Sequence, residues 1–290
     1  MRQNNSVVEV RIQYSFQVEP LSSGLGARIS GIDFHPSFDD TVMGAIRQAW
    51  LNYFVVVISG QTLSSEEQLK FTEWFGARQT VRTVRQTKDA PQNYMYVANK
   101  SVEGLEGVLP EGEMQFHTDQ CYYETPSRAT VLYAIEVPQT GGNTKFANAY
   151  RAYESLGGST KARIRGLYAS NVYDYQANAT EKKNQSSPDA PRYEHPVVIR
   201  HPETGREVLY VNRLMTDFLV GLDGDESDEL LEELFCAIED PSHIYEHAWS
   251  PGDLVMWDNL CTQHARTWFD PKMTRVLRRT SLAGSAPLAA

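Results

Sequence analysis

Apolar residues recur with the period of an α-helix in three segments of the chain. The first covers residues 41–53, where one face carries Val42, Ala45, Ile46, Ala49 and Trp50. The second begins after Ser64, since Ser64 followed by Glu67 has the pattern of an N-terminal capping box, and Gly76 is typical of a helix end. The third covers residues 226–238, with an apolar face built mainly from leucines.

The rest of the pattern predicts short strands separated by turns. Residues 54–58 are continuously apolar and rich in β-branched side chains, which is typical of a buried strand. Further strands are predicted at 94–97, 129–134, 208–211, 243–249, 253–257 and 275–282. Many short strands with Gly and Pro between them favour a mainly β fold with flanking helices, either a sandwich or a jelly roll.

No internal repeat or linker divides the 290 residues, so we expect one domain over 1–290. Residues 1–15 are interpreted as an N-terminal arm and the small residues of 285–290 as a flexible tail. Polar stretches at 83–93, 100–115 and 174–193 interrupt the strands. The last of them is either disordered or a mobile lid over a site.

Composition narrows the classes of partner and compartment. The formal net charge of −10 argues against nucleic acid and against anionic membranes, which both attract clustered Lys and Arg. Three widely spaced cysteines fit a reducing compartment better than a disulfide framework. The first residues lack the apolar stretch of a signal peptide, and residues 54–58 are too short to span a bilayer. We therefore expect a soluble, cytoplasmic protein.

The candidate chemistry begins at His117-Thr118-Asp119. On a strand, residues two apart point to the same face, so this imidazole and carboxylate would stand side by side. They would supply two ligands of a two-His-one-carboxylate iron site, although a His-x-Asp sequence also arises by chance. His264 is a candidate for the third ligand, because it follows the predicted strand 253–257 and a turn. A single histidine is, however, more often a structural hydrogen-bonding residue.

The predicted strand after His264 carries three arginines. Arg275 and Arg279 are four apart and share a face of the predicted strand 275–282, and buried guanidinium groups need anionic partners. Alternation sends Arg278 to the opposite face, where a solvated basic edge is the simplest expectation. Residues 141–144, Gly-Gly-Asn-Thr, form a predicted turn that leads into a strand with Thr144 at its start.

Other histidines are weaker candidates. His201 lies in the sequence His-Pro-Glu before Gly205, which predicts an exposed polar hairpin turn. His243 and His247 fall on one predicted strand, where four residues span about 13 Å, too far for one metal ion. The sequence contains no Gly-x-Gly-x-x-Gly, Walker or Gly-x-Ser-x-Gly motif, which removes the simplest nucleotide-binding and serine-hydrolase interpretations.

Taken together, these motifs resemble the taurine dioxygenase/phenoxyacetate dioxygenase (TauD/TfdA) family of Fe(II)- and 2-oxoglutarate-dependent oxygenases. The resemblance extends from about residue 18 to residue 280 and rests on the joint spacing of several motifs. These are Gly24–Ala27, Ile29–Asp33, His117–Asp119, Gly141–Thr144, His201–Gly205 and Trp257–Asn259. It implies a double-stranded β-helix, that is, a cupin-like jelly roll, in agreement with the strand pattern.

The resemblance also implies roles for single residues. His117, Asp119 and His264 match the iron ligands of the family, and Thr144 and Arg275 match the positions that bind the distal carboxylate of 2-oxoglutarate. Arg279 matches a position that binds the sulfonate of taurine. The implied cofactors are Fe(II), 2-oxoglutarate as cosubstrate, and O2, and homologues of this kind often form dimers or tetramers.

Two positions depart from the taurine enzyme. Glu113 stands where that enzyme has a substrate-contacting Asn, and Met215 replaces an aromatic substrate contact. A carboxylate beside a bound sulfonate would repel it, so taurine is a poor candidate substrate. Alkylsulfonates or sulfate esters, aryloxyalkanoates, and amino-acid or natural-product intermediates all stay open.

The expected reaction hydroxylates a small organic substrate that bears an anionic group, with release of succinate and CO2. If the hydroxyl group is placed on a carbon bonded to sulfur, oxygen or nitrogen, the hydroxylated product would be unstable and would break at that bond. Two alternatives keep the same ligands: a metal-binding jelly roll without oxygenase activity, and a zinc hydrolase. Neither of them requires Arg275 or Thr144.

Overall fold

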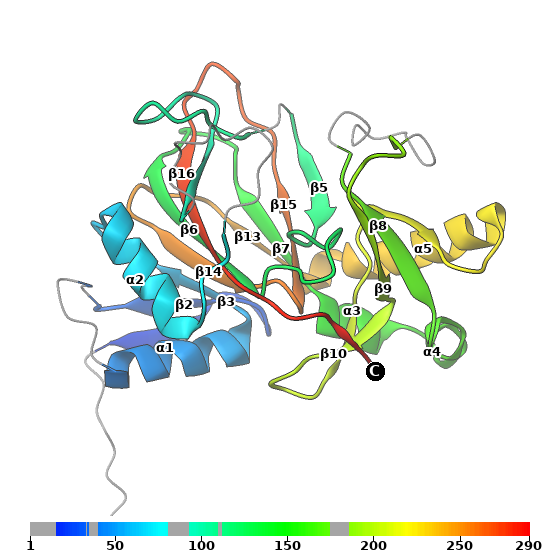
Figure 1. The fold of residues 1–290 in the computed structure, drawn as a ribbon. Helices are drawn as coiled ribbons and strands as arrows, with labels where there is room; N and C mark the ends of the chain where they lie inside the picture. The colour runs from blue at the N-terminus through cyan, green and yellow to red at the C-terminus, as the bar shows by residue number, and fades with distance from the viewer. Residues whose placement is uncertain (1–15, 33, 35–39, 81–92, 110–111, 175–185) are drawn as a thin grey trace, which may run out of the picture.

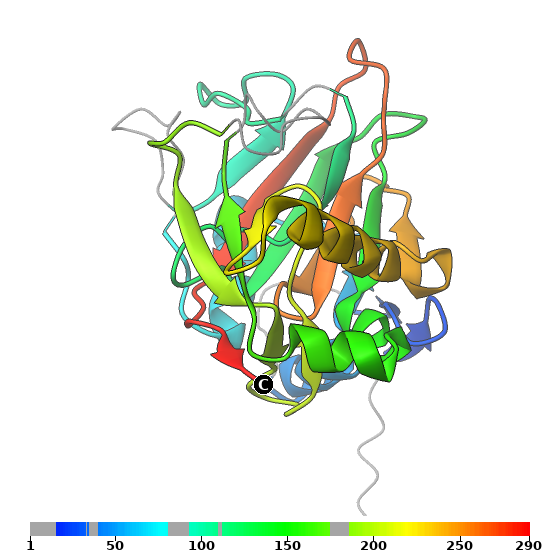
Figure 2. The same cartoon turned by 90° about the vertical axis from the view of Figure 1, so that its right-hand side faces the viewer.

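The computed structural model describes residues 16–32, 34, 40–80, 93–109, 112–174 and 186–290. Two antiparallel-rich sheets face each other across the main hydrophobic core (Figures 1 and 2). Phe146 of one sheet and Trp257 of the other touch in this core, with ring centroids 5.3 Å apart. The predicted N-terminal arm 1–15 lies outside the described residues.

The larger sheet has seven strands. Their order is β1 (Gln17–Pro20), β2 (Ala27–Ser30), β3 (Val55–Ile58), β14 (Leu254–Asp258), β6 (Ala129–Glu136), β16 (Val276–Leu282) and β4 (Met95–Ala98). The smaller sheet has the order β13 (Ile244–His247), β7 (Thr144–Asn148), β15 (Thr262–Arg266) and β5 (Met114–His117). All neighbouring pairs are antiparallel except β2 with β3.

Two further three-stranded sheets extend the molecule. One has the order β12 (Thr216–Leu219), β8 (Tyr168–Val172) and β9 (Arg192–Pro196), and the other has the order β11 (Glu207–Leu209), β10 (Val198–Arg200) and β17 (Leu288–Ala289). The helices are α1 (Asp40–Tyr53), α2 (Ser65–Phe75), α3 (Ala149–Ser155), α4 (Gly158–Ile164), α5 (Gly224–Ile238) and the 3-10 turn η1 (Pro241–His243). In Figure 1, α1 and α2 lie on one side of the molecule, and α5 lies on the other beside β8 and β9.

Alternation along β6 explains why the larger sheet is buried on both faces. Leu132 and Ala134 belong to the core between the sheets, whereas Val131 and Tyr133 belong to a second core beneath α1 and α2. Because successive strand residues point to opposite faces, one β-branched and aliphatic strand serves both cores. The inner face carries the candidate site.

The three predicted helices are confirmed as α1, α2 and α5, each within two residues at the start. Ser64 caps α2 as predicted: its hydroxyl accepts from the Glu67 backbone N–H, and the Glu67 carboxylate accepts from the Ser64 backbone. None of the helices in the described part of the chain is both long and apolar enough to cross a bilayer.

Three local predictions differ from the structure. Arg278 points to the opposite face from Arg279, as alternation requires, but it is 6% exposed because α2 covers that face. The tail expected to be flexible over 285–290 ends in β17, which pairs with β10. The predicted strand 243–249 begins as the 3-10 turn η1 and becomes a strand only at Ile244.

Candidate metal centre

Two adjacent strands of the smaller sheet bring His117 and His264 together. His117 is the last residue of β5, and His264 lies directly opposite it in the middle of β15. Their ring centroids are 4.0 Å apart, as expected of a facing antiparallel pair. His264 does follow the predicted strand and a turn, as β14 and the turn after it show, but it lies within a further strand, β15, whose polar residues hid its pattern.

Asp119 completes the cluster from the turn that follows β5, rather than from the strand itself. One ligand atom from each of His117, Asp119 and His264 lies within 4.8 Å of the others, and Asp119 Oδ1 is 3.9 Å from His264 Nε2. His117 and Asp119 are buried, and His264 is 13% exposed at its side chain. The cluster therefore has the donor set of a two-His-one-carboxylate site.

The surroundings of the two imidazoles fit metal binding. The Gln115 carbonyl lies 2.9 Å from His117 Nδ1, which orients the ring and leaves Nε2 for the cluster. His264 Nδ1 is buried without a hydrogen-bond partner among the described residues. Burial, with His117 adding to it, holds the pKa of His264 well below its usual value, so the imidazole is neutral, as ligation requires.

The Asp119 carboxylate is held as an anion in a specific orientation. Its Oδ2 accepts a 2.5 Å hydrogen bond from Thr130 Oγ1 and forms a 3.0 Å ion pair with Arg279 Nη2. Burial alone raises the pKa of Asp119, but the charge of Arg279 and the hydrogen bond from Thr130 act against burial, and the carboxyl pKa lies well below the usual range. Oδ1 is left as the oxygen that faces His264.

Thr144 begins β7, opposite Arg266 and so two residues along β15 from His264, and Arg275 directly precedes β16. Thr144 Oγ1 accepts a 3.0 Å hydrogen bond from Trp249 Nε1, so its own O–H proton is free to donate. Arg275 is 2% exposed and donates from Nε to the Gly142 carbonyl at 3.1 Å. Within the described residues it has no carboxylate partner, and burial, with Arg266 adding to it, lowers its pKa to about 9. A buried cation in this state favours an anionic ligand.

The glycine turn before β7 makes this arrangement possible. Gly141 and Gly142 both have positive φ, and a Cβ on Gly142 would meet Pro138 Cγ at 2.9 Å and Arg275 Cδ at 3.4 Å. A Cβ on Gly141 would collide with the Trp268 carbonyl. The turn therefore packs its bare backbone against the aliphatic part of Arg275 and holds the guanidinium in place.

Arg266 is a site residue that the sequence reasoning missed. It lies opposite Thr144 on β15, and its charge lowers the pKa of both Arg275 and His117. Its Nη2 donates to the Gly112 carbonyl at 2.6 Å. The available signal was its spacing, because a residue two after His264 on a strand shares the face of that histidine.

The predicted substrate residues lie at different depths. Met215 is buried, and its sulfur contacts the Cys121 thiol at 3.6 Å, close to Asp119 in the chain. Glu113 is exposed just before β5, on the surface and away from the buried side chains of the cluster. Arg279 lies on the inner face beside Asp119, and its Nε donates to Ser281 Oγ at 3.3 Å. The predicted lid 174–193 lies largely outside the described residues.

A second cluster, His201, Asp258 and Cys261, also has metal-ligating side chains close together. The hairpin turn predicted after His201 is confirmed between β10 and β11, but His201 itself is 1% exposed, so its predicted exposure is wrong. Its Nδ1 accepts from the backbone N–H groups of residues 203 and 204, which makes Nε2 the protonated nitrogen that donates to Asp258 at 3.0 Å. Arg128 neutralises Asp258, and no imidazole lone pair is left for a metal.

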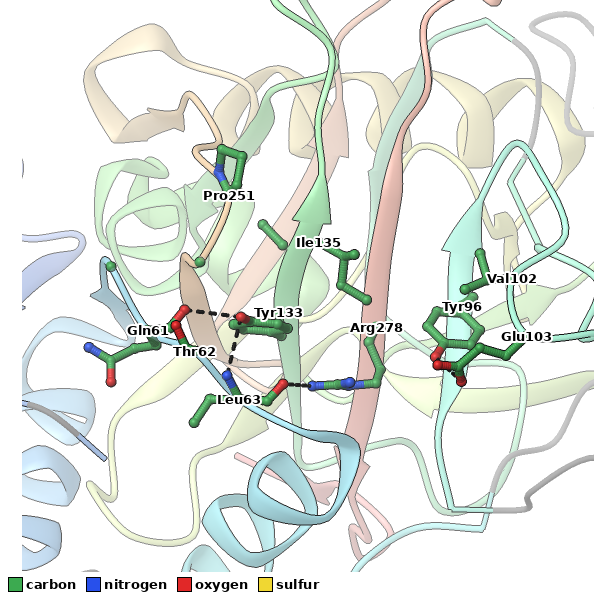
Figure 3. Close-up of a pocket in the computed structure, with 13 residues that line it drawn as sticks. Gln61, Thr62, Leu63, Tyr96, Val102, Glu103, Tyr133, Ile135, Pro251 and Arg278 are labelled. Carbon is green, nitrogen blue, oxygen red and sulfur yellow. Dashed lines mark hydrogen bonds between the residues drawn. The ribbon is translucent and has the colours of Figure 1, made fainter. Parts of the chain in front are cut away.

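A pocket of about 580 Å3 opens on the outer face of the larger sheet (Figure 3). Its polar groups satisfy one another: the Tyr133 hydroxyl bridges the Gln61 carbonyl and the Leu63 N–H, and Arg278 donates to the Leu63 carbonyl. The Arg278 guanidinium also lies 5.1 Å above the Tyr133 ring. These contacts fasten the segment before α2 to the sheet, whereas His117, Asp119 and His264 lie with the inner core.

The family model "Taurine catabolism dioxygenase TauD, TfdA family" matches residues 17–281. The chain belongs to this family. A (S)-phenoxypropionate/alpha-ketoglutarate-dioxygenase of Sphingobium herbicidovorans is 30% identical over 93% of this chain and 96% of its own length. A pentalenolactone F synthase of Streptomyces avermitilis is 33% identical over 89% and 90% of the two chains.

Among solved structures, AAD-2 in complex with Mn(II) and N-oxalylglycine superposes with a TM-score of 0.78 at 26% identity, covering 94% of this chain and 99% of that one. The fold is therefore the jelly roll expected of a TauD/TfdA protein. The chain is an Fe(II)-dependent dioxygenase of this family that uses 2-oxoglutarate and O2 and acts on a small organic substrate.

Proposed function

We propose that His117, Asp119 and His264 hold the Fe(II) of this dioxygenase, and that Thr144 and Arg275 bind the distal carboxylate of 2-oxoglutarate. The convergence of the three donor side chains within 4.8 Å carries the proposal. With Fe(II) bound, the centre supplies the oxidation chemistry that turns 2-oxoglutarate and O2 into succinate and CO2 while the substrate is hydroxylated. The protein binds, orients and desolvates the reactants.

Arg275 supports the cosubstrate assignment most directly. Among the described residues, the Arg275 guanidinium bonds to a neutral carbonyl and not to a carboxylate. The Thr144 hydroxyl has a proton to donate. Together they offer a charged donor and a neutral donor to one carboxylate, in a buried site where such bonds are strong. N-oxalylglycine, bound in AAD-2, differs from 2-oxoglutarate by an NH group in place of a CH2 group and has the same distal carboxylate.

For the substrate, we propose an organic anion with an apolar body. Arg279 uses Nη2 on Asp119 and Nε on Ser281, which leaves Nη1 for a carboxylate, sulfate or sulfonate. Tyr122 lies near this guanidinium, which lowers the phenol pKa against the larger rise that burial causes. Tyr122 stacks on Tyr173 at 4.7 Å and provides an aromatic surface. Met215 is a further apolar side chain nearby, since its sulfur contacts the thiol of Cys121, which precedes Tyr122, and Glu113 is exposed.

The test uses anaerobic protein with Fe(II) and 2-oxoglutarate. We expect the weak visible charge-transfer band of a chelated 2-oxo acid, and substrate-dependent succinate release from organic acids but not from their uncharged amides. Absence of both the band and iron retention would overturn the iron assignment. Equal turnover of acids and amides would overturn the anionic substrate. Activity with Zn(II) in the absence of O2 would instead favour the zinc hydrolase alternative.

We also propose an oligomeric state and a cellular compartment for the protein. Membership of the family supports a homodimer or homotetramer, and light scattering after gel filtration tests it, a monomer being the contrary result. Cys121, Cys236 and Cys261 are all free thiols, which supports a reducing compartment such as the cytoplasm. Cell fractionation tests the latter.

A further inference from the structure

The Trp257-Asp258-Asn259 sequence lies where β14 ends, and all three side chains are about 1% exposed. Asp258 faces Arg128 and His201, away from the metal centre. Trp257 and Asn259 instead connect to the candidate metal centre. Trp257 lies directly opposite Thr130 in the β14–β6 pair, and Thr130 is the residue that bonds to the candidate ligand Asp119.

A continuous chain of buried hydrogen bonds joins these residues to the metal centre. Trp257 Nε1 donates to Asn259 Oδ1 at 2.8 Å, Asn259 Nδ2 donates to Thr130 Oγ1 at 3.1 Å, and Thr130 Oγ1 donates to Asp119 Oδ2 at 2.5 Å. Thr130 is 0% exposed, so no solvent competes for its hydroxyl.

The direction of every bond in this chain follows from its first member. An indole N–H can only donate, so the amide oxygen of Asn259 must face Trp257 and its NH2 group must face Thr130. The Thr130 oxygen therefore accepts from Asn259, and its single proton has one remaining acceptor, Asp119 Oδ2. A hydroxyl that would otherwise rotate is fixed as a donor to the carboxylate.

We propose that Trp257, Asn259 and Thr130 form a one-way hydrogen-bond relay that positions Asp119 for metal binding. The inference rests on the proposed function, because it takes Asp119 as a ligand. Thr130 and Arg279 together hold Oδ2 from the larger sheet, which leaves Oδ1 facing His264 on the smaller one. The three relay members are positioning residues, and they hold the carboxylate in its orientation before a metal binds.

The test is Mn(II) affinity, measured by calorimetry on metal-free protein without substrate. Loss of a partner that orients a ligand typically weakens metal binding by about 10- to 100-fold. We expect a loss in this range for Thr130→Val, near wild-type affinity for Thr130→Ser, which keeps the hydroxyl, and an intermediate loss for Asn259→Leu. Thr280→Val is the matched control. Thr280 is a buried threonine on the outer face of β16 whose hydroxyl bonds to Thr72.

The possible outcomes distinguish failure of the relay from failure of the proposed metal site. If wild-type protein does not bind Mn(II), the proposed function fails. If wild type binds but Thr130→Val binds equally well, or Thr130→Ser is as weak as Thr130→Val, the relay is overturned. Should Thr130→Val fail to fold, Asn259→Leu decides, since it leaves Thr130 in place and unchanged affinity would contradict the proposal. A loss in Thr280→Val would trace the effect to packing and overturn it too.

Discussion

Asp119 combines two demands that normally conflict, because it is buried and yet has to be negatively charged. Thr130 and Arg279 resolve the conflict by donating to Oδ2, and the two imidazoles lie on the other side. Asp119→Ala removes the only acidic member of the cluster. We expect loss of Mn(II) binding and of coupled succinate release, whereas Asp225→Ala, at the exposed start of α5, should change neither. Retained turnover in Asp119→Ala would show that the ligands are misassigned.

Arg275 gives a prediction in which binding and stability move differently. Its guanidinium is buried without a carboxylate partner in the described part of the chain, and under the proposed function 2-oxoglutarate supplies that partner. Losing one side of such a buried pair costs about 2 kcal/mol or more, roughly 30-fold in affinity. Arg275→Met should therefore raise the KM for 2-oxoglutarate at least this much.

The same substitution should leave the metal-free protein as stable as wild type or slightly more so in urea, because it removes an uncompensated buried charge. Arg275→Lys keeps the charge but loses the bidentate geometry, and it should fall between the two in KM. An unchanged KM in Arg275→Met would remove Arg275 from the cosubstrate site.

At the scale of elements, the prediction succeeded where local chemistry decides the structure. The capping box of Ser64 and Glu67 and the helical spacing over 41–53 need only near neighbours. The strands of the smaller sheet were harder. β5, β7 and β15 are short and carry functional polar residues inward, so their alternation is inverted relative to an ordinary half-buried strand. Only their joint spacing, through the family resemblance, pointed to the site.

Burial by a distant element was equally invisible in the sequence. Alternation correctly separated Arg278 from Arg279, but only the packed structure places α2 over Arg278 and supplies the acceptors Gln68 and Leu63. His201 was assigned to the surface for the same reason, since its partner Asp258 lies 57 residues away in the chain. Long-range partners decide both positions, and no local pattern encodes them.

The cap of α2 provides an element-scale test that should not affect the chemistry. Replacing an N-cap serine with alanine typically costs about 1 kcal/mol, since a backbone N–H of the first turn loses its acceptor. Ser64→Ala should lower the free energy of unfolding by this amount in urea, with unchanged KM and kcat. Ser65→Ala, one residue into the helix, is the matched control and should cost less. Equal costs for the two variants would contradict a role of the capping box in stability.

At the scale of the whole molecule, the metal centre joins the two sheets of the jelly roll. The imidazoles come from β5 and β15 of the smaller sheet, whereas Thr130 and Arg279, which hold Asp119, come from β6 and β16 of the larger one. Arg275 directly precedes β16 and bonds to the turn that leads into β7. Ligands bound here therefore contact groups from both layers, and their binding energy adds to the stability of the folded state.

The size of this effect can be stated for each ligand separately. A ligand at one hundred times its Kd stabilises the folded state by about 2.7 kcal/mol, which for a chain of this size is a rise in Tm of about 5 °C. Mn(II) should raise the Tm of the metal-free protein, and 2-oxoglutarate should raise it again. At the same ligand concentrations, the Mn(II) step should remain in Arg275→Met, and the 2-oxoglutarate step should fall to about a third of its wild-type size or less. In Asp119→Ala both steps should disappear, because 2-oxoglutarate would also bind through the metal. A full 2-oxoglutarate step in Asp119→Ala would mean that the cosubstrate binds independently of the metal, and the shared centre between the sheets would have to be abandoned.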